Sequence, residues 1–217
     1  MSDRANNKAA PEAGLVGYAF VDSETTGLNP ELHSIWELAI LFRQRSAATG
    51  RWADSGPLLH FVICPERRVL KDADPIALEV GNFQERISAL GLEPGQSLQL
   101  DLSGEIIDRP QFSEICSLVW SEFRNQADPV HLVGANPSFD SEFLLRLLAV
   151  ERAPWHHRMV DVESMAMQRF GLARPPGLQE SAKLLDVVPG IAHSARGDVQ
   201  TTLAVFEELN GIPEFTS

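Results

Sequence analysis

Four acidic residues occupy positions from which their carboxylates could converge on one point. Asp22 and Glu24 follow the apolar run 17–21. Residues two apart in a strand point to the same face, so these two carboxylates are expected side by side at a strand's end. Asp140 follows a second predicted strand at the opening of a helix, and Asp198 lies in the first turn of the last predicted helix. Ligands in α/β sheets gather at the carboxyl ends of strands, so we expect the four side chains to meet at one edge of the sheet.

Four carboxylates that share one site repel each other strongly unless cations neutralise them. Oxygen ligands of this kind suit hard divalent ions, so the four residues together predict a site for two metal ions, Mg²⁺ or Mn²⁺. Each residue also has a simpler interpretation when it is taken alone. An isolated aspartate at a helix start usually caps the helix, and Asp22 with Glu24 would form a polar turn. Only the combination favours metal binding.

The hydrophobic pattern predicts the elements that would position these side chains. Three early strands are expected at 17–21, 35–43 and 58–64, with a hairpin link at 47–56 between the second and third. Further strands are expected at 130–134 and 158–162, and helices at 111–125, 136–148, 163–170, 179–187 and 195–209, with short helices around 76–90. Early strands followed by alternating helices and strands predict an α/β fold with a mixed central sheet and helices on both faces.

The helix expected at 111–125 carries six apolar residues at helical spacing, and Asp108 with Pro110 supplies its start signal. Its expected inward face consists of Phe112, Ile115, Cys116, Val119, Trp120 and Phe123. Residues 1–14 are small and polar and are expected to be a mobile tail, so that 15–217 form a single domain with a longer connection at 65–110.

Composition narrows the class of protein. The 217 residues are 44% hydrophobic and 22% charged, which is typical of one soluble globular domain and excludes a disordered chain. No apolar run is long enough to cross a bilayer and no signal peptide is recognisable, so a cytoplasmic protein without membrane contact is expected. The two cysteines are too few for a disulfide framework. The sequence lacks the motifs G-x-S-x-G, G-x-x-x-x-G-K-[ST] and G-x-G-x-x-G, which excludes the hydrolases, P-loop enzymes and dinucleotide enzymes that carry them.

The net charge of −12 excludes a broad basic surface of the kind that holds a nucleic-acid backbone by charge alone. Contact with a polyanion would need bound divalent ions or a basic partner. His156 and His157 could suggest a zinc site, but adjacent residues on a strand face opposite ways, so we expect two surface histidines.

Three segments of the sequence resemble the three exonuclease motifs of the DEDDh 3′–5′ exonucleases, the group of the proofreading epsilon subunit of bacterial replicative polymerases. The segments are FVDSETTGL (20–28), GANPSFDSEFL (134–144) and HSARGD (193–198). Each motif alone is weak, but the order of the three along the chain is specific. The resemblance covers roughly residues 16–209 and implies a ribonuclease H-like fold.

The resemblance implies a role for each matched residue. Asp22, Glu24, Asp140 and Asp198 would hold two metal ions, with Glu24 taking part in catalysis, and His193 would be the general base. The backbone after Glu24 and an apolar side chain would hold the 3′-terminal nucleotide. The substrate-binding residues implied are Thr25, Thr26, Gly27, Leu28, Asn136 and Phe139.

The sequence therefore predicts a metal-dependent 3′–5′ exonuclease that removes nucleoside 5′-monophosphates from single-stranded nucleic acid, with DNA favoured. One alternative is an oligoribonuclease or RNA-trimming exonuclease with the same site. An alternative of another class is a non-catalytic module that binds nucleic acid or a polymerase. The expected partners are 3′ ends of single-stranded DNA or RNA and a polymerase or other tethering protein.

Overall fold

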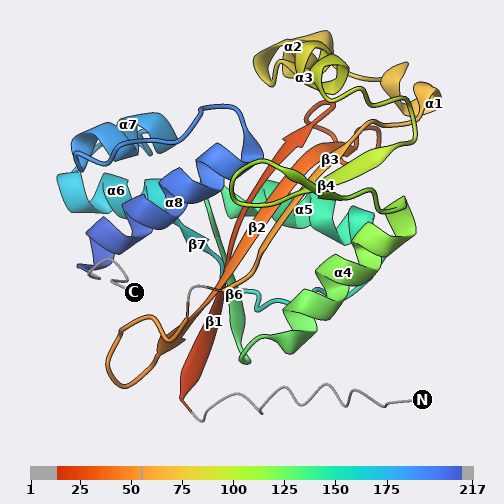
Figure 1. Ribbon diagram of the computed structural model, residues 1–217. Coiled ribbons are helices and arrows are strands. Elements are labelled where there is room, and N and C mark those ends of the chain that lie inside the picture. The colour runs from red at the N-terminus through yellow and green to blue at the C-terminus, as the bar shows by residue number, and fades with distance from the viewer. Residues whose placement is uncertain (1–13, 55, 212–217) are drawn as a thin grey trace, which may run out of the picture.

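A seven-stranded mixed sheet in the order β5-β4-β3-β2-β1-β6-β7 forms the centre of the structure, a computed structural model that describes residues 14–54 and 56–211 (Figure 1). β1 pairs antiparallel with β2 and parallel with β6, which confirms the predicted mixed sheet. The strands are β1 (Leu15–Thr25), β2 (Ile35–Ser46), β3 (Leu58–Ile63), β4 (Ser97–Leu100), β5 (Ile106–Asp108), β6 (Val130–Gly134) and β7 (Val160–Asp161).

Helices cover both faces of this sheet, as predicted (Figure 1). The helices are α1 (Arg67–Leu70), α2 (Pro75–Val80), α3 (Phe83–Ala89), α4 (Phe112–Asn125), α5 (Pro137–Leu148), α6 (Val162–Phe170), α7 (Leu178–Leu184) and α8 (Ala195–Asn210). α4 and α5 pack on one face, and α6, α7 and α8 pack on the other. The fold is therefore an α/β sandwich with its sheet in the middle layer.

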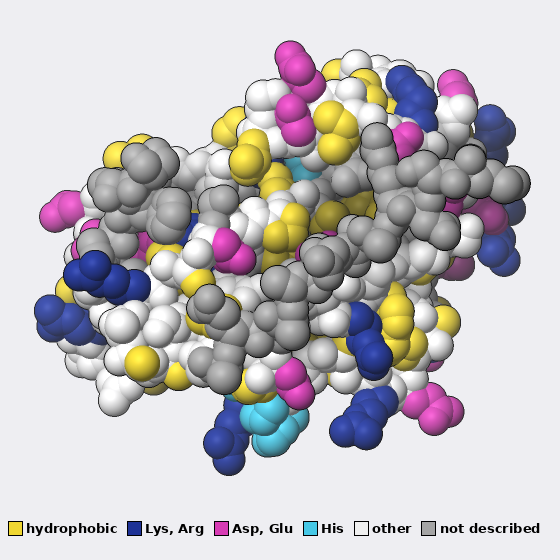
Figure 2. Space-filling view, turned by 60° about the horizontal axis from the view of Figure 1, so that its bottom comes forward, with side chains coloured by type: hydrophobic (Ala, Val, Ile, Leu, Met, Phe, Trp, Pro, Cys, Tyr) yellow, Lys and Arg dark blue, Asp and Glu magenta, His cyan; other side chains and the backbone are white. Residues whose placement is uncertain are grey.

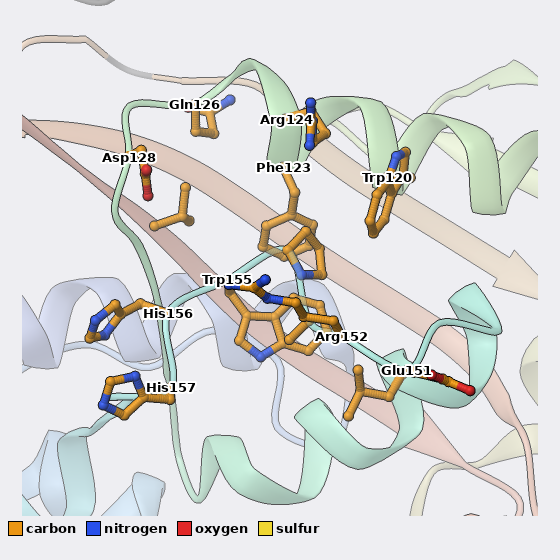
Figure 3. Close-up of a pocket in the computed structure, with 14 residues that line it drawn as sticks. Trp120, Phe123, Arg124, Gln126, Asp128, Glu151, Arg152, Trp155, His156 and His157 are labelled. Carbon is orange, nitrogen blue, oxygen red and sulfur yellow. The ribbon is translucent and has the colours of Figure 1, made fainter.

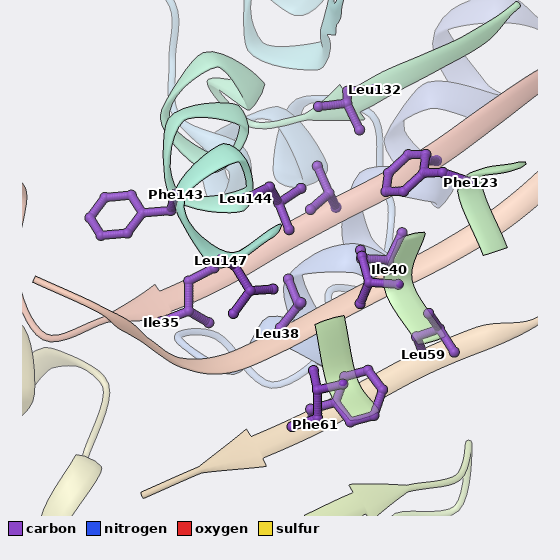
Figure 4. Close-up of a cluster of buried hydrophobic side chains, with 14 of the residues drawn as sticks. Ile35, Leu38, Ile40, Leu59, Phe61, Phe123, Leu132, Phe143, Leu144 and Leu147 are labelled. Carbon is purple, nitrogen blue, oxygen red and sulfur yellow. The ribbon is translucent and has the colours of Figure 1, made fainter. Parts of the chain in front are cut away.

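Alternation along β1 explains how one strand serves both layers. Ala19 and Val21 belong to the core under α4 and α5, whereas Phe20 belongs to the core under α8. β2 lies at the centre of the sheet and is buried on both faces from Ile35 to Arg43, which is why this segment reads as a continuous apolar run. Figure 4 shows α5 directing Leu144 and Leu147 toward the strands of the first core.

The connection 65–110 adds β4 and β5 to one edge of the sheet, and its helix α3 packs against residues of β2 and β3. The short helices expected around 76–90 are present as α2 and α3, whereas α1, β4 and β5 were not predicted. Phe83, Ile87 and Leu98 of this connection form a third core with Trp36 and further residues of the sheet. The connection is therefore a packed part of the domain, and α2 and α3 lie above the carboxyl end of β1 (Figure 1).

Three predictions about local structure need correction. Phe112 and Trp120 were expected to face inward, but they are 53% and 36% exposed, because α4 packs on the sheet through Ile115, Val119 and Phe123. The helix expected at 111–125 is present as α4, but Asp108 and Pro110 do not cap it: Gln111 is the N-cap and forms a capping box with Glu114. The strand expected at 158–162 shortens to β7, since Asp161 caps α6 by accepting a hydrogen bond from the backbone N–H of Glu163.

The predicted mobile tail lies outside the described residues except for Gly14, whose carbonyl accepts a hydrogen bond from the backbone N–H of Ala47. None of the helices in the described part of the chain is long and apolar enough to cross a membrane.

Candidate active site

Three of the four predicted carboxylates lie together at the carboxyl end of β1. Asp22 and Glu24 come from the same face of β1, and Asp198 comes from the first turn of α8, which packs on that face. One carboxylate oxygen from each residue lies within 4.8 Å of the other two. Ser194 is the N-cap of α8 and accepts a hydrogen bond from the backbone N–H of Gly197, which fixes the turn that carries Asp198.

Asp140 approaches the cluster from the opposite face of the sheet. It lies in the first turn of α5 and is 4% exposed. Ser23 points to this face, between the two carboxylates of β1, and its hydroxyl donates a hydrogen bond of 2.7 Å to Asp140 Oδ1. Sequence reasoning missed this contact, because it joins residues 117 positions apart.

The pKa values of all four carboxyl groups are raised. Burial raises the pKa of Asp22 well above its ordinary value, and the charges of Asp140, Asp198 and Glu24 add to this effect. Burial raises the pKa of Glu24 to about 7, aided by the charges of Glu37 and Asp198. Burial also raises the pKa of Asp140 to about 7, against the hydrogen bond from Ser23, and raises the pKa of Asp198. Bringing these carboxylates together therefore costs free energy that a bound cation would recover.

The donor set fits hard divalent cations. All four side chains offer carboxylate oxygens, and the three that come within 4.8 Å of each other could share one ion. The charge of Asp140 raises the pKa of Asp22, so the carboxylate of Asp140 adds to the same acidic site. Oxygen donors of this kind suit Mg²⁺ and Mn²⁺ better than thiolate-preferring metals.

His193 lies in the loop that enters α8 and is exposed to solvent. Its backbone N–H donates a hydrogen bond of 3.0 Å to Asp198 Oδ2, so the loop folds back onto the cluster. Its φ of 56° lies in the left-handed region, which is unusual for a residue other than glycine. The loop is also held by close packing at its base, where a Cβ on Gly190 would lie 2.6 Å from the carbonyl oxygen of Gly197.

The end of β1 and the turn that follows it contain four of the predicted substrate-binding residues. The hydroxyls of Thr25 and Thr26 are used inside the turn: Thr25 donates to the carbonyl of Gly27, and Thr26 accepts from the backbone N–H of Ser34. A Cβ on Gly27 would collide with the ring of His33, so this position requires glycine. Leu28 is 75% exposed at the tip of the turn and is the one of the four whose side chain is open to a ligand.

The two substrate-binding residues expected on α5 differ in their surroundings. Asn136 is the exposed N-cap of α5 with a φ of 58°, and its side-chain oxygen accepts a hydrogen bond from the hydroxyl of Ser138. Phe139 is half-buried and packs against Phe143 with ring centroids 4.9 Å apart. One side of the Phe139 ring therefore packs in the core of the fold.

A buried charge network beside the cluster was not predicted. Glu37 on β2 is 0% exposed, and its carboxylate contacts His60 Nε2 at 2.8 Å and Arg86 Nη2 at 2.5 Å. Burial acts to raise the pKa of Glu37, but the hydrogen bonds from His60 and Arg86 outweigh it and lower that pKa. The signal that could have found this network is a glutamate inside the apolar run 35–43, because an unpaired carboxylate is not tolerated there.

A pocket of about 960 Å³ lies apart from the acidic cluster, around the start of β6 (Figure 3). Trp120, Arg124 and Arg152 are among the residues that line it. Figure 3 shows the rings of His156 and His157 side by side at one end of this pocket, and their centroids are 4.2 Å apart. His157 is exposed and His156 is partly buried, so the surface position expected for them holds in full only for His157. The argument from a strand was wrong, since both lie in the loop between α5 and β7.

Comparisons with known proteins support the fold. No protein-family model matches the chain, and no curated protein matches it. Among solved structures the chain is similar to the one described as "The structure of exonuclease I suggests how processivity is achieved", with a TM-score of 0.59 and 18% sequence identity. The similarity covers 92% of this chain and 41% of the other. At this identity the comparison shows the fold, which is the ribonuclease H-like α/β fold expected from the motifs.

Proposed function

We propose that this protein is a metal-dependent 3′–5′ exonuclease that acts on single-stranded nucleic acid, with DNA favoured over RNA. The observation that carries the proposal is the cluster of Asp22, Glu24 and Asp198 within 4.8 Å, with Asp140 beside it. Phosphodiester hydrolysis needs carboxylates that hold divalent ions, whereas a module that only binds nucleic acid does not need four mutually repelling carboxylates. The similarity of fold to an exonuclease adds support to this choice.

In the proposed reaction, water attacks the terminal phosphorus, the bond from phosphorus to the 3′ oxygen breaks, and a nucleoside 5′-monophosphate leaves. Two divalent ions, when bound, would activate the attacking water and stabilise the negative charge on the leaving oxygen. Asp22, Glu24, Asp140 and Asp198 would hold these ions. His193 would accept the proton of the attacking water, a task for which imidazole is suited near neutral pH.

Leu28 is proposed to contact the last base of the substrate, since its exposed side chain lies four residues after Glu24. Such a contact would be apolar and local. Figure 2 brings forward the lower side of Figure 1, away from the carboxyl end of β1, and there lysine and arginine side chains lie mostly around the periphery. The net charge of −12 favours recognition of unpaired terminal nucleotides over binding along a long phosphate backbone.

The test is digestion of oligonucleotides labelled at the 5′ end, as single-stranded DNA and as single-stranded RNA, with Mg²⁺, with Mn²⁺ and with EDTA. We expect a ladder of labelled products that shorten one nucleotide at a time, only when metal is present, and faster on DNA. Asp22→Asn should abolish the ladder, and Asp101→Asn, which changes a partly exposed loop carboxylate outside the cluster, should not. Faster turnover of RNA would favour the RNA-trimming alternative, and binding without any cleavage would refute the enzyme.

A further inference from the structure

The buried carboxylate of Glu37 links the central sheet to the element that carries His193. Glu37 Oε2 accepts a hydrogen bond of 3.0 Å from the backbone N–H of Ala195, the first residue of α8. Its other oxygen, Oε1, contacts Arg86 and His60. Glu37 therefore anchors the start of α8 to β2 and depends on Arg86 to compensate its buried charge.

Arg86 reaches this carboxylate from α3, within the connection 65–110. Its guanidinium forks: Nη2 contacts Glu37 Oε1 at 2.5 Å, and Nη1 donates a hydrogen bond of 3.4 Å to the carbonyl oxygen of His193. The guanidinium also lies over the ring of Trp36, 4.8 Å from its centroid, which restricts where the fork can go. The planar guanidinium of Arg86 thus contacts both the buried carboxylate of Glu37 and the loop that carries His193.

These contacts hold the backbone of His193 from both sides. Its N–H is bonded to Asp198, its carbonyl to Arg86, and the N–H of Ala195, two residues later, to Glu37. A left-handed φ of 56° costs free energy in a residue with a Cβ and persists only where surrounding contacts impose it. Two of the three contacts pass through the pair of Arg86 and Glu37.

We propose that Arg86 is a positioning residue that sets the direction of the His193 side chain over the acidic cluster. The connection 65–110 thereby gains a role in the reaction, because it delivers this arginine through α3. The proposal rests on the proposed function for its catalytic meaning, but the coupling of Arg86 to the loop is a property of the structure that can be measured without any substrate.

The decisive variant is Arg86→Lys. Lysine keeps the positive charge that compensates Glu37, but it has no planar fork with which to serve Glu37 and the His193 carbonyl together. The matched control is Arg43→Lys. Arg43 also lies over a tryptophan, 4.7 Å from the centroid of Trp52, and also donates to a carbonyl, that of Asp54 at 2.9 Å, on a stretch of β2 away from the cluster.

The first measurement is amide hydrogen exchange in the metal-free proteins. We expect the amides of 193–195 to exchange about tenfold faster in Arg86→Lys than in wild type, since local opening becomes easier when the carbonyl contact is lost. The Arg43→Lys control should leave these amides unchanged. Unchanged exchange in Arg86→Lys, or an equal increase in Arg43→Lys, would overturn the proposal whether or not the protein is a nuclease.

The second measurement is the rate of oligonucleotide digestion in the single variants and in a double-mutant cycle. Arg86→Lys should lower kcat about tenfold at an unchanged KM, as expected when a catalytic group is misplaced by a fraction of an ångström. In the His193→Ala background the same substitution should not lower kcat further, because Arg86 is proposed to affect the reaction only through the His193 side chain. Equal losses in both backgrounds would show that Arg86 acts by another route. A wild-type protein without cleavage would instead refute the proposed function, and the exchange experiment would still decide the coupling.

Discussion

Asp22→Asn should stabilise the metal-free protein at about pH 8 and stabilise it much less at about pH 5. The pKa values of Asp22, Glu24, Asp140 and Asp198 are all raised in the folded protein. For carboxyl groups with raised pKa values, the folded state binds protons more tightly than the unfolded state. Their favourable contribution is therefore fully present below the ordinary carboxyl pKa of about 4 and is lost as the pH rises through the raised pKa values, which are about 7 for Glu24 and Asp140. Asparagine mimics the protonated carboxyl and removes the repulsion.

The size of the effect follows from the geometry of the cluster. Two unit charges 4.8 Å apart interact by roughly 3 kcal/mol when the effective dielectric constant is about 20. Removing the charge of Asp22 relieves at least one such pair, and protonation of its neighbours in the wild type limits the gain. We therefore expect a gain of about 2–3 kcal/mol. In a domain of this size each kcal/mol shifts Tm by about 2–4 °C, so Tm should rise by roughly 5–10 °C.

The assay is thermal unfolding followed by circular dichroism after removal of metal with EDTA, at both pH values. The control is Asp101→Asn, because hydrogen bonds from Ser103 and from the backbone N–H of Glu105 lower the pKa of Asp101. That substitution should not raise Tm at either pH. If Asp22→Asn melts no higher than wild type at about pH 8, or gains as much at about pH 5, the electrostatic account of the cluster is wrong.

Three further outcomes are expected. Mg²⁺ or Mn²⁺ at a hundredfold excess over its Kd should stabilise the wild type by about 2.7 kcal/mol in thermal unfolding, and the Asp198→Asn protein should lose most of this stabilisation. Equal stabilisation of the wild type and the variant would show that the ions bind elsewhere. His193→Ala should lower the rate of digestion about 10²- to 10⁴-fold with an unchanged metal affinity by calorimetry, whereas loss of metal binding would make His193 a ligand. Binding of single-stranded DNA should depend weakly on salt, with log affinity against log salt concentration giving a slope of magnitude about 1–3. An excess of unlabelled oligonucleotide added as a trap should stop digestion of a labelled strand early, as for an enzyme that needs a tethering partner to stay on its substrate. A steep slope together with many successive cleavages of one strand would show a basic surface that follows the phosphate backbone.

The sequence predicted the sheet and its helical layers because those features are local. Alternation and apolar runs predicted most of β2, β3 and β6 and the middle of β1, and the 3.6-residue period predicted α4, α5 and α8. Where the period left a choice, packing decided it: Phe112 and Trp120 fit the helical face of α4 but lie beyond the part that meets the sheet. The short elements α1, β4 and β5 carry too few residues for any period to be seen.

The candidate site, too, could be predicted from the sequence only in part. The acidic residues could be found because each ends or begins an element, and the topology of an α/β sheet brings such ends together. The contacts of Ser23 with Asp140 and of Arg86 with Glu37 could not be found, because no local pattern records which side chains meet across the fold. A charged residue within a buried strand, as at Glu37, indicates that a partner exists but does not identify it.

The parts of the site are far apart along the chain. Ser23 and Asp140 are separated by 117 residues, Arg86 and His193 by 107, and Glu37 and Ala195 by 158. Synthesis at about 5–20 residues per second places roughly 10–35 s between the appearance of Asp22 and that of Asp198. During that interval the growing chain holds at most part of its acidic cluster. For the nuclease proposed above, hydrolytic capacity therefore arrives only after α8 has been made and docked, and the messenger RNA at the ribosome meets an incomplete enzyme until then.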